Sequence, residues 1–144
     1  IIRELINIEP TNKGTNIELA LKYLTNIIKK KSITFLISDF KDNNSYSDAM
    51  KIANRKHDLV ALRINDMHEN KLPNVGLIKL KDNETGKVMW VDTSDKSFQK
   101  KMEVNHLKFE AQIKDVFTKS GVDFTTINTH EGYIKPLMTL FKKR

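Results

Sequence analysis

The chain has 144 residues, a length that fits one domain with a sizeable core. Its composition, with 39% hydrophobic and 30% charged residues, is typical of globular proteins and excludes disordered and fibrous classes. The absence of Cys excludes a disulfide framework, a thiolate metal site and a Cys nucleophile. Because a chain without Cys fits a reducing compartment, we expect a cytoplasmic location.

The net charge of +7 raises the question of a nucleic-acid partner. The basic residues are spread along the chain, however, and the densest clusters, 29–31 and 142–144, fall at predicted carboxyl ends of helices, where cations suit the helix dipole. No apolar run approaches the roughly 18 residues that a membrane span needs. The sequence therefore predicts no nucleic-acid partner and no membrane span.

The first predicted element is an amphipathic helix with Ile2, Leu5 and Ile6 on one face. The chain starts inside this helix and has no initiator Met, so we expect it to be a piece of a longer protein.

A second helix follows the turn-rich residues 9–14. Its apolar residues recur at three- and four-residue steps over 17–30. Thr15 and Glu18 have the spacing of a capping box, in which a hydroxyl and a carboxylate bond the first amides of the helix. From the residues alone, helix capping is enough to explain Thr15.

Residues 33–37 are apolar or β-branched without alternation, which is typical of a strand covered on both faces of a parallel sheet. We expect this strand to be central. Ser38 and Asp39 follow at its carboxyl end, where open α/β sheets bind their ligands. Asp39 is therefore the first candidate for a site residue, with loop ordering as the alternative role.

A third helix is predicted to begin near Ser45, with Asp48 as its capping-box partner. The mostly apolar run 59–64 then predicts a second buried parallel strand. Strand, helix and strand in this order make one βαβ unit, which is expected to be right-handed.

Residues 75–80 and 87–91 flank a Gly-containing loop and predict a β-hairpin, either an edge extension of the sheet or an arm lying across it. Trp90 alternates with Val88 on one face, and we expect it to be buried in the core or in an interface. Turn chemistry accounts for the polar residues that border the hairpin, which are Asp82, Glu84, Asp92 and Thr93.

A long helix over 96–120 is predicted to end at Gly121. Residues 122–127 alternate more than the earlier strands and predict a strand nearer an edge. A final helix follows, with Pro136 in its first turn. The fold class is therefore α/β: an open, mostly parallel sheet flanked by helices, with an added β-hairpin.

The titratable pairs of the chain carry little sign of catalysis. His57-Asp58 and His68-Glu69 are adjacent residues and lack the helical spacing of a zinc pair, so we interpret both as structural or surface groups. No Gly-rich phosphate loop, nucleophile elbow or pair of catalytic carboxylates is present in the sequence. An enzymatic activity is not supported by these residues.

Several segments taken together match one known family. They are Gly14-Thr15-Asn16-Ile17, Leu36-Ile37-Ser38-Asp39-Phe40, Arg55-Lys56-His57-Asp58-Leu59-Val60-Ala61-Leu62-Arg63, Asn65-Asp66-Met67-His68-Glu69, Leu72-Pro73, Asp82-Asn83-Glu84-Thr85-Gly86, Trp90-Val91-Asp92-Thr93 and Gly121-Val122-Asp123. With them the chain resembles the domain of unknown function 58 family, which belongs to the von Willebrand factor A-like superfamily.

The resemblance implies an open α/β sheet with a metal-ion-dependent adhesion site at its carboxyl edge. Such sites combine an Asp-x-Ser-x-Ser motif, a later Thr and an Asp after the fourth strand; here Thr15 matches the Thr and Asp39 the last Asp, with Asn16 and Ser38 beside them. The Asp-x-Ser-x-Ser motif is absent. The resemblance thus implies a single domain over 1–144, the carboxyl-terminal portion of a von Willebrand factor A-like domain that lacks its first strands.

Function follows from the same resemblance. It implies a protein-interaction module that holds Mg²⁺ in the complete domain, whereas this piece would bind Mg²⁺ weakly or not at all. It also implies that the partner is a MoxR-type AAA ATPase, in assembly or chaperone-like work. A metal-dependent phosphodiester hydrolase and a metal-free structural domain are the alternatives. The missing first strand would leave the edge of the strand over 33–37 bare, so we expect this piece to dimerise through it.

Overall fold

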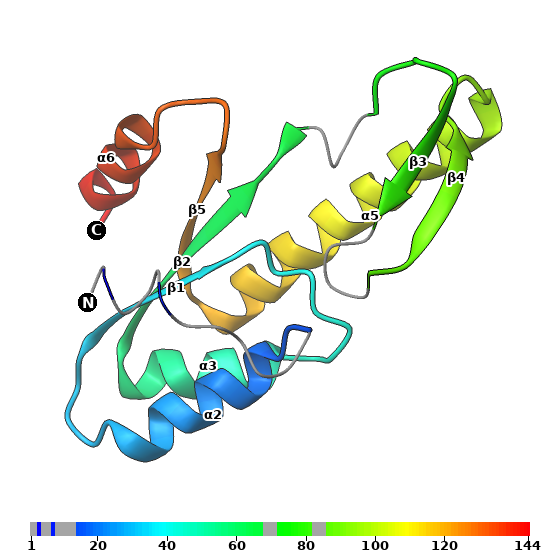
Figure 1. Cartoon of the computed structure of the whole chain (residues 1–144). Helices are drawn as coiled ribbons and strands as arrows, with labels where there is room; N and C mark the ends of the chain where they lie inside the picture. Colours follow the sequence, from blue (N-terminus) through cyan, green and yellow to red (C-terminus); the bar gives the residue numbers. More distant parts are fainter. Residues whose placement is uncertain (1–2, 4–6, 8–13, 68–71, 82–85) are drawn as a thin grey trace.

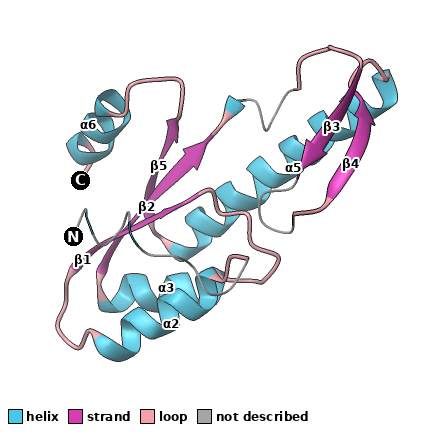
Figure 2. Ribbon diagram, in the orientation of Figure 1, coloured by secondary structure: helices cyan, strands magenta, loops and turns pink. Residues whose placement is uncertain are grey.

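The computed structural model of the chain describes residues 3, 7, 14–67, 72–81 and 86–144 (Figures 1 and 2). Arg3 and Asn7 are helical, and the rest of the predicted first helix lies outside the described residues. The elements are, in chain order, α2 (Ile17–Ile27), β1 (Ile33–Ser38), α3 (Ser47–Lys56), β2 (Asp58–Asn65), β3 (Leu77–Lys81), β4 (Val88–Asp92), α5 (Lys96–Ser120), β5 (Asp123–Asn128) and α6 (Ile134–Lys142).

The main sheet is parallel, in the order β1-β2-β5, with Ile33 level with Asp58 and Val60 level with Asp123. β2 lies in its centre, and its side chains over 59–63 are all buried. The prediction that β1 is central is wrong for the described sheet. β1 lies at an edge, and its odd-numbered side chains, Ile33, Phe35 and Ile37, are exposed. The prediction that β5 is nearer an edge is confirmed.

Helices cover both faces of this sheet (Figure 1). On one face, α2, α3 and α5 enclose a core that includes Leu21, Met50, Leu59 and Phe117. On the other face, α6 places Leu140 against Val60 and Leu62. The α/β architecture with a mostly parallel sheet flanked by helices is thereby confirmed. Within the described residues, no helix is long and apolar enough to cross a membrane.

The helix ends depart from the predicted capping boxes. Asn16, not Thr15, is the N-cap of α2, because its side-chain Oδ1 accepts a hydrogen bond from the amide of Leu19 at 2.8 Å. Ser45 does not cap α3, whose N-cap is Tyr46 without a side-chain hydrogen bond. The predicted end of α5 is confirmed: Gly121 has φ 65°, the left-handed conformation that glycine adopts without a Cβ penalty.

The hairpin β3–β4 forms its own two-stranded sheet, so it is not an edge extension of the main sheet. At its base, the buried Thr93 donates from Oγ1 to the carbonyl of Gly76 at 2.8 Å, and Gln99 of α5 donates to the Thr93 carbonyl at 2.6 Å. The expectation that Trp90 is buried in the core is wrong, because the side chain is 65% exposed; its burial in an interface stays a prediction. Asp82 and Glu84 lie outside the described residues, as do His68 and Glu69.

Candidate functional site

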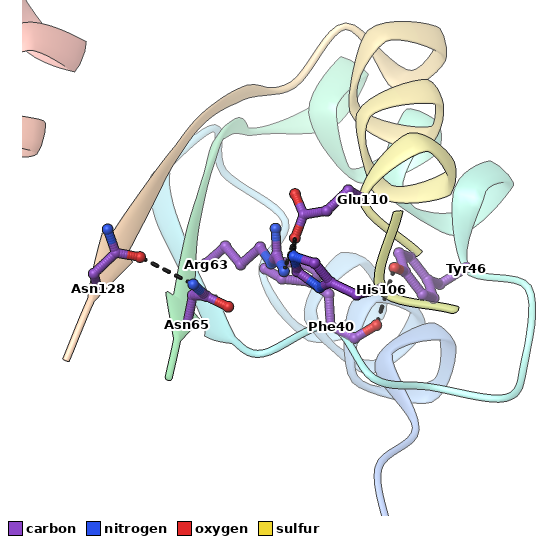
Figure 3. A network of polar contacts seen from close by, with 7 residues as sticks. All are labelled: Phe40, Tyr46, Arg63, Asn65, His106, Glu110 and Asn128. Atoms are coloured by element: carbon purple, nitrogen blue, oxygen red, sulfur yellow. Dashed lines mark hydrogen bonds and ion pairs between the residues drawn. The ribbon is translucent and has the colours of Figure 1, made fainter. Parts of the chain in front are cut away.

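Polar side chains gather where the three parallel strands end. Ser38 is the last residue of β1, Asn65 the last of β2 and Asn128 the last of β5. The Asn65 Nδ2 donates to Asn128 Oδ1 at 3.0 Å (Figure 3). The Asn128 Nδ2 donates to Glu131 Oε2 at 3.1 Å. Because the carboxyl ends of parallel strands share one edge of a sheet, this edge is the natural position for a ligand site.

Asp39 comes directly after β1 and is half-buried at this edge. Its Oδ1 accepts from the amide of Lys41 at 3.1 Å and lies 3.5 Å from Ser38 Oγ, which donates to it. Ser38 Oγ in turn accepts from the amide of Phe40 at 3.0 Å. Asp39 therefore orders the turn in which it lies, which is the alternative role expected for it from the sequence.

The turn contains a strained residue. Phe40 has φ 63°, a conformation that is uncommon for a bulky side chain and costs on the order of 1–3 kcal/mol. The Phe40 ring is fully buried, at 5.0 Å from the Phe117 ring and 6.1 Å from the Tyr46 ring between centroids. The Tyr46 hydroxyl donates to the Phe40 carbonyl at 3.3 Å (Figure 3). Packing on both partners thus imposes the unusual backbone beside Asp39.

Asp42 joins this turn to the start of α2. Its Oδ2 accepts from the amide of Ile17 at 2.7 Å, while Oδ1 accepts from the Asn44 amide at 2.8 Å and the Asn44 side chain at 2.9 Å. The segment with Thr15, which is half-buried, therefore meets the segment with Ser38 and Asp39 at one edge of the sheet. Asp42 has no distinctive motif in the sequence and is marked there only by the polar run that follows β1.

The pKa of Asp42 lies below its ordinary value. Burial of the carboxyl group raises this pKa. The hydrogen bonds from the Asn44 amide, the Ile17 amide and the Asn44 side chain lower it, and together they outweigh the effect of burial. A carboxylate with a depressed pKa in the folded protein stabilises the fold above the unfolded-state pKa of about 3.9. This contribution is lost as the pH falls through the lower, folded-state value.

We expect Asp42→Ala to lower the free energy of unfolding by about 1–2 kcal/mol at neutral pH, because the first amide of α2 loses its acceptor. Urea unfolding over a pH series measures this. The difference from the unsubstituted chain should shrink in acid, and Asn43→Ala, on the exposed neighbour, should change stability by less than about 0.5 kcal/mol. A difference that is constant with pH would contradict the role of the carboxylate.

Arg63 and Glu110 form a second polar group beside the turn (Figure 3). Arg63 is 5% exposed in β2, and its Nη2 contacts Glu110 Oε1 of α5 at 2.5 Å. The guanidinium lies 5.5 Å from the centroid of the Phe109 ring, and His106 Nε2 lies 3.9 Å from Glu110 Oε1. The hydrogen bond from Arg63 is the main cause that lowers the pKa of Glu110. The pair ties α5 to the central strand.

A cavity of about 630 Å³ opens between the turn after β1 and α5. Phe40, Met102, Phe109 and Ile113 give it apolar walls, and the polar residues at its wall are Lys41, Asp42, Asn43, Asn105, His106 and Gln112. A second cavity of about 720 Å³ lies between the base of the hairpin and the first turns of α5. We place the candidate site at the turn after β1, beside the first cavity, because Phe40, Lys41 and Asp42 of this turn line that cavity.

The metal-ligating residues available here are few. Thr15 and Asp39 offer a hydroxyl and a carboxylate, which are hard oxygen ligands of the kind Mg²⁺ prefers. Among the described residues, no group of three or more His, Asp or Glu side chains is placed to hold a metal ion. The donor type therefore fits Mg²⁺, and further ligands would have to come from water or from other chain segments.

His57 agrees with its predicted structural role. It ends α3, is 1% exposed, and its Nδ1 lies 3.1 Å from Ser32 Oγ. Asp58 is paired with Arg144 at the amino end of β2, and Arg144 Nε lies 2.9 Å from Asp123 Oδ2. These groups lie at the opposite ends of the strands from Asp39 and take no part in the candidate site.

Comparison with known proteins gives one match. A family model described as "Protein of unknown function DUF58" matches residues 1–112, which include β1, β2, the hairpin and most of α5. No curated protein and no solved structure matches the chain.

Proposed function

The chain belongs to the family of proteins of unknown function DUF58, and on this premise we propose that it is a protein-interaction module of von Willebrand factor A type. The observation that carries the proposal is the position of Asp39. It follows a parallel strand, in a turn whose backbone is strained at Phe40 and tied to α2 through Asp42. Strained and well-supported backbone of this kind is concentrated at functional sites.

In this module, Asp39 and Thr15 would hold a Mg²⁺ ion together with an upstream Asp-x-Ser-x-Ser motif. Asn16 and Ser38 would support it through the hydrogen bonds they make at the α2 cap and in the turn. The bound ion supplies an open coordination position for a carboxylate from a partner. The neighbouring 630 Å³ cavity, with apolar walls and a polar rim, would receive partner side chains around that carboxylate.

The resemblance suggests a MoxR-type AAA ATPase as this partner. The test uses a longer protein, extended upstream to include the expected Asp-x-Ser-x-Ser motif, in unsubstituted form and as Asp39→Ala and Asp42→Asn. The dissociation constant between each form and the purified ATPase is measured at a fixed Mg²⁺ concentration, so that the ATPase itself is unaffected. We expect Asp39→Ala to weaken binding about 100-fold or more, the effect of losing a charge-assisted contact of roughly 3 kcal/mol. Equal binding by Asp39→Ala would contradict the proposal.

The rival activity, hydrolysis of phosphodiesters, is tested on the same proteins with bis(p-nitrophenyl) phosphate and Mg²⁺. Our proposal expects no turnover above the uncatalysed rate. Turnover that depends on Mg²⁺ and is lost in Asp39→Ala would assign the site to a hydrolase instead.

The exposed edge of β1 suggests self-association of this piece of the protein. Within the described residues β1 pairs only with β2, and Ile33, Phe35 and Ile37 are 66%, 47% and 62% exposed. An apolar edge strand is a template for pairing with another chain.

We predict a dimer at micromolar concentration, measured by sedimentation. Ile37→Lys should weaken it at least tenfold, whereas Leu19→Lys, on the similarly exposed Leu19 of α2, should not. A monomer throughout the concentration series would remove this proposal.

A further inference from the structure

One face of the hairpin combines exposed apolar and basic side chains. In the antiparallel register Lys79 lies opposite Trp90, and Lys81 lies opposite Val88. Residues directly opposite share one face of a two-stranded sheet. Leu77 lies on the same face, two residues from Lys79, and the exposed fractions of Leu77, Val88 and Trp90 are 65%, 49% and 65%. Asp92, the register partner of Leu77, lies on this face too, and we call these six residues the hairpin face.

The opposite face of the hairpin is partly buried. Ile78 and Val91 are register partners there, and Val91 is 8% exposed. Leu80 and Met89 are the other register partners on this face, and Met89 is 60% exposed, so the burial is confined to the base of the hairpin. On the hairpin face, Leu77, Trp90 and Val88 are all exposed. A single exposed apolar residue needs no explanation, but an exposed Trp with two apolar neighbours forms a continuous patch of the kind that marks an interaction surface.

The charge of this region is predominantly basic. Besides Lys79 and Lys81, the first turns of α5 carry the exposed Lys96, Lys100 and Lys101; the exposed acidic residues there are Asp95, the N-cap of α5, and Glu103. Asp92, opposite Leu77, is the only acidic residue in the described part of the two strands. Figure 1 places the hairpin at the far end of the molecule from α2 and α3.

We propose that the hairpin face binds peripherally to the surface of an anionic phospholipid bilayer. Trp90 would enter the interfacial layer, where its amphipathic ring is favoured, and Lys79 and Lys81 would contact lipid phosphates. Basic charge complements the anionic surface, and the apolar residues between the lysines supply the buried area that interfacial binding needs.

A flat surface fits the hairpin face better than a peptide or a nucleic acid does. Its side chains line neither of the two cavities beside α5, so they offer no recess for the side chains of a peptide. Trp90 is the only Trp of the chain, and the face has no further aromatic residue on which successive bases could stack.

Because Trp90 is the only Trp, intrinsic fluorescence reports on this face directly. We expect vesicles of phosphatidylcholine and phosphatidylserine, but not of phosphatidylcholine alone, to shift the emission to shorter wavelength. Lys79→Gln/Lys81→Gln should weaken partition about 25-fold, since each lysine near an anionic surface contributes a factor of roughly five. In a vesicle co-sedimentation assay, Trp90→Ala should weaken partition by roughly tenfold.

The matched control is Lys29→Gln/Lys30→Gln, which removes the same charge from the exposed segment that follows α2. It should change partition less than about threefold. Asp39→Ala should also bind vesicles normally, so failure here and failure of the metal-dependent module are distinguishable. Three results would overturn the proposal. The Trp90 emission could stay unchanged with phosphatidylserine vesicles, or the two double lysine variants could lose partition equally. The emission could also shift only with polyglutamate or a single-stranded oligonucleotide.

Discussion

Replacing Phe40 with Ala is expected to lower the free energy of unfolding by about 3–5 kcal/mol, the usual cost of deleting a buried aromatic ring. Phe40 is fully buried and packs edge-on against Phe117. Its φ of 63° adds a sharper expectation, because Ala retains the Cβ that is strained in this conformation. Phe40→Gly should therefore be more stable than Phe40→Ala by about 1 kcal/mol.

Phe117 provides the matched control for Phe40. It belongs to the same aromatic cluster and is 1% exposed, but it lies inside α5, where glycine is less favourable than alanine. Both Phe117 variants should lose several kcal/mol, with Phe117→Gly the less stable by about 0.5–1 kcal/mol. Urea unfolding of the four variants shows whether the Ala or the Gly variant is the more stable one at each position. The same order at both positions would contradict the strained turn beside Asp39.

Removing the carboxylate of Glu110 is expected to have the second largest effect. Glu110→Leu leaves the guanidinium of Arg63 buried without its ion-pair partner, which costs about 3–5 kcal/mol for a fully buried pair. The Glu110 side chain is 39% exposed, so we expect the lower part of this effect, about 2–3 kcal/mol. Adding Arg63→Met should recover most of the loss, because no unpaired charge then remains.

An exposed ion pair on the same helix is the control. Lys119 and Asp115 are joined at 2.7 Å, but their side chains are 69% and 55% exposed, so Asp115→Ala should cost less than about 0.5 kcal/mol. The pKa of Glu110 is lowered by Arg63, so the stabilisation should be complete at neutral pH and lost as the pH falls below the ordinary value of about 4.3. If the double variant loses as much free energy of unfolding as Glu110→Leu and Arg63→Met lose in sum, the account of the pair is contradicted.

The elements of this fold could be predicted because their signals are local. The end of α5 at Gly121 depends on one residue in a left-handed conformation, and the apolar run of β2 identifies a strand wherever it packs. The position of β1 in the sheet could not be read in the same way. Its apolar residues indicate that both faces can be covered, but in the described chain only the face with Leu36 is packed against the core.

The polar groups of the candidate site were predicted only in part. Asp39 and Ser38 follow a recognisable strand, whereas Asp42 bonds an amide 25 residues away and Arg63 pairs with Glu110 across 47 residues. Such contacts depend on the tertiary arrangement, which periodicity does not contain. The capping role fell to Asn16 rather than Thr15 because the helix begins one residue later than the capping box suggests.

The metal-dependent module is tested most directly by thermal unfolding with and without Mg²⁺. The protein to use is a longer one, extended upstream to include the expected Asp-x-Ser-x-Ser motif, compared with its Asp39→Ala and Asp42→Asn variants. At about 100 times its dissociation constant, a ligand of the native state adds roughly 2.7 kcal/mol, which corresponds to a shift on the order of 5–10 °C. Our account predicts this shift in the unsubstituted protein and in Asp42→Asn, and its loss in Asp39→Ala. The same melting temperature with and without Mg²⁺ in all three proteins would contradict it and leave Thr15 and Asp39 as structural residues.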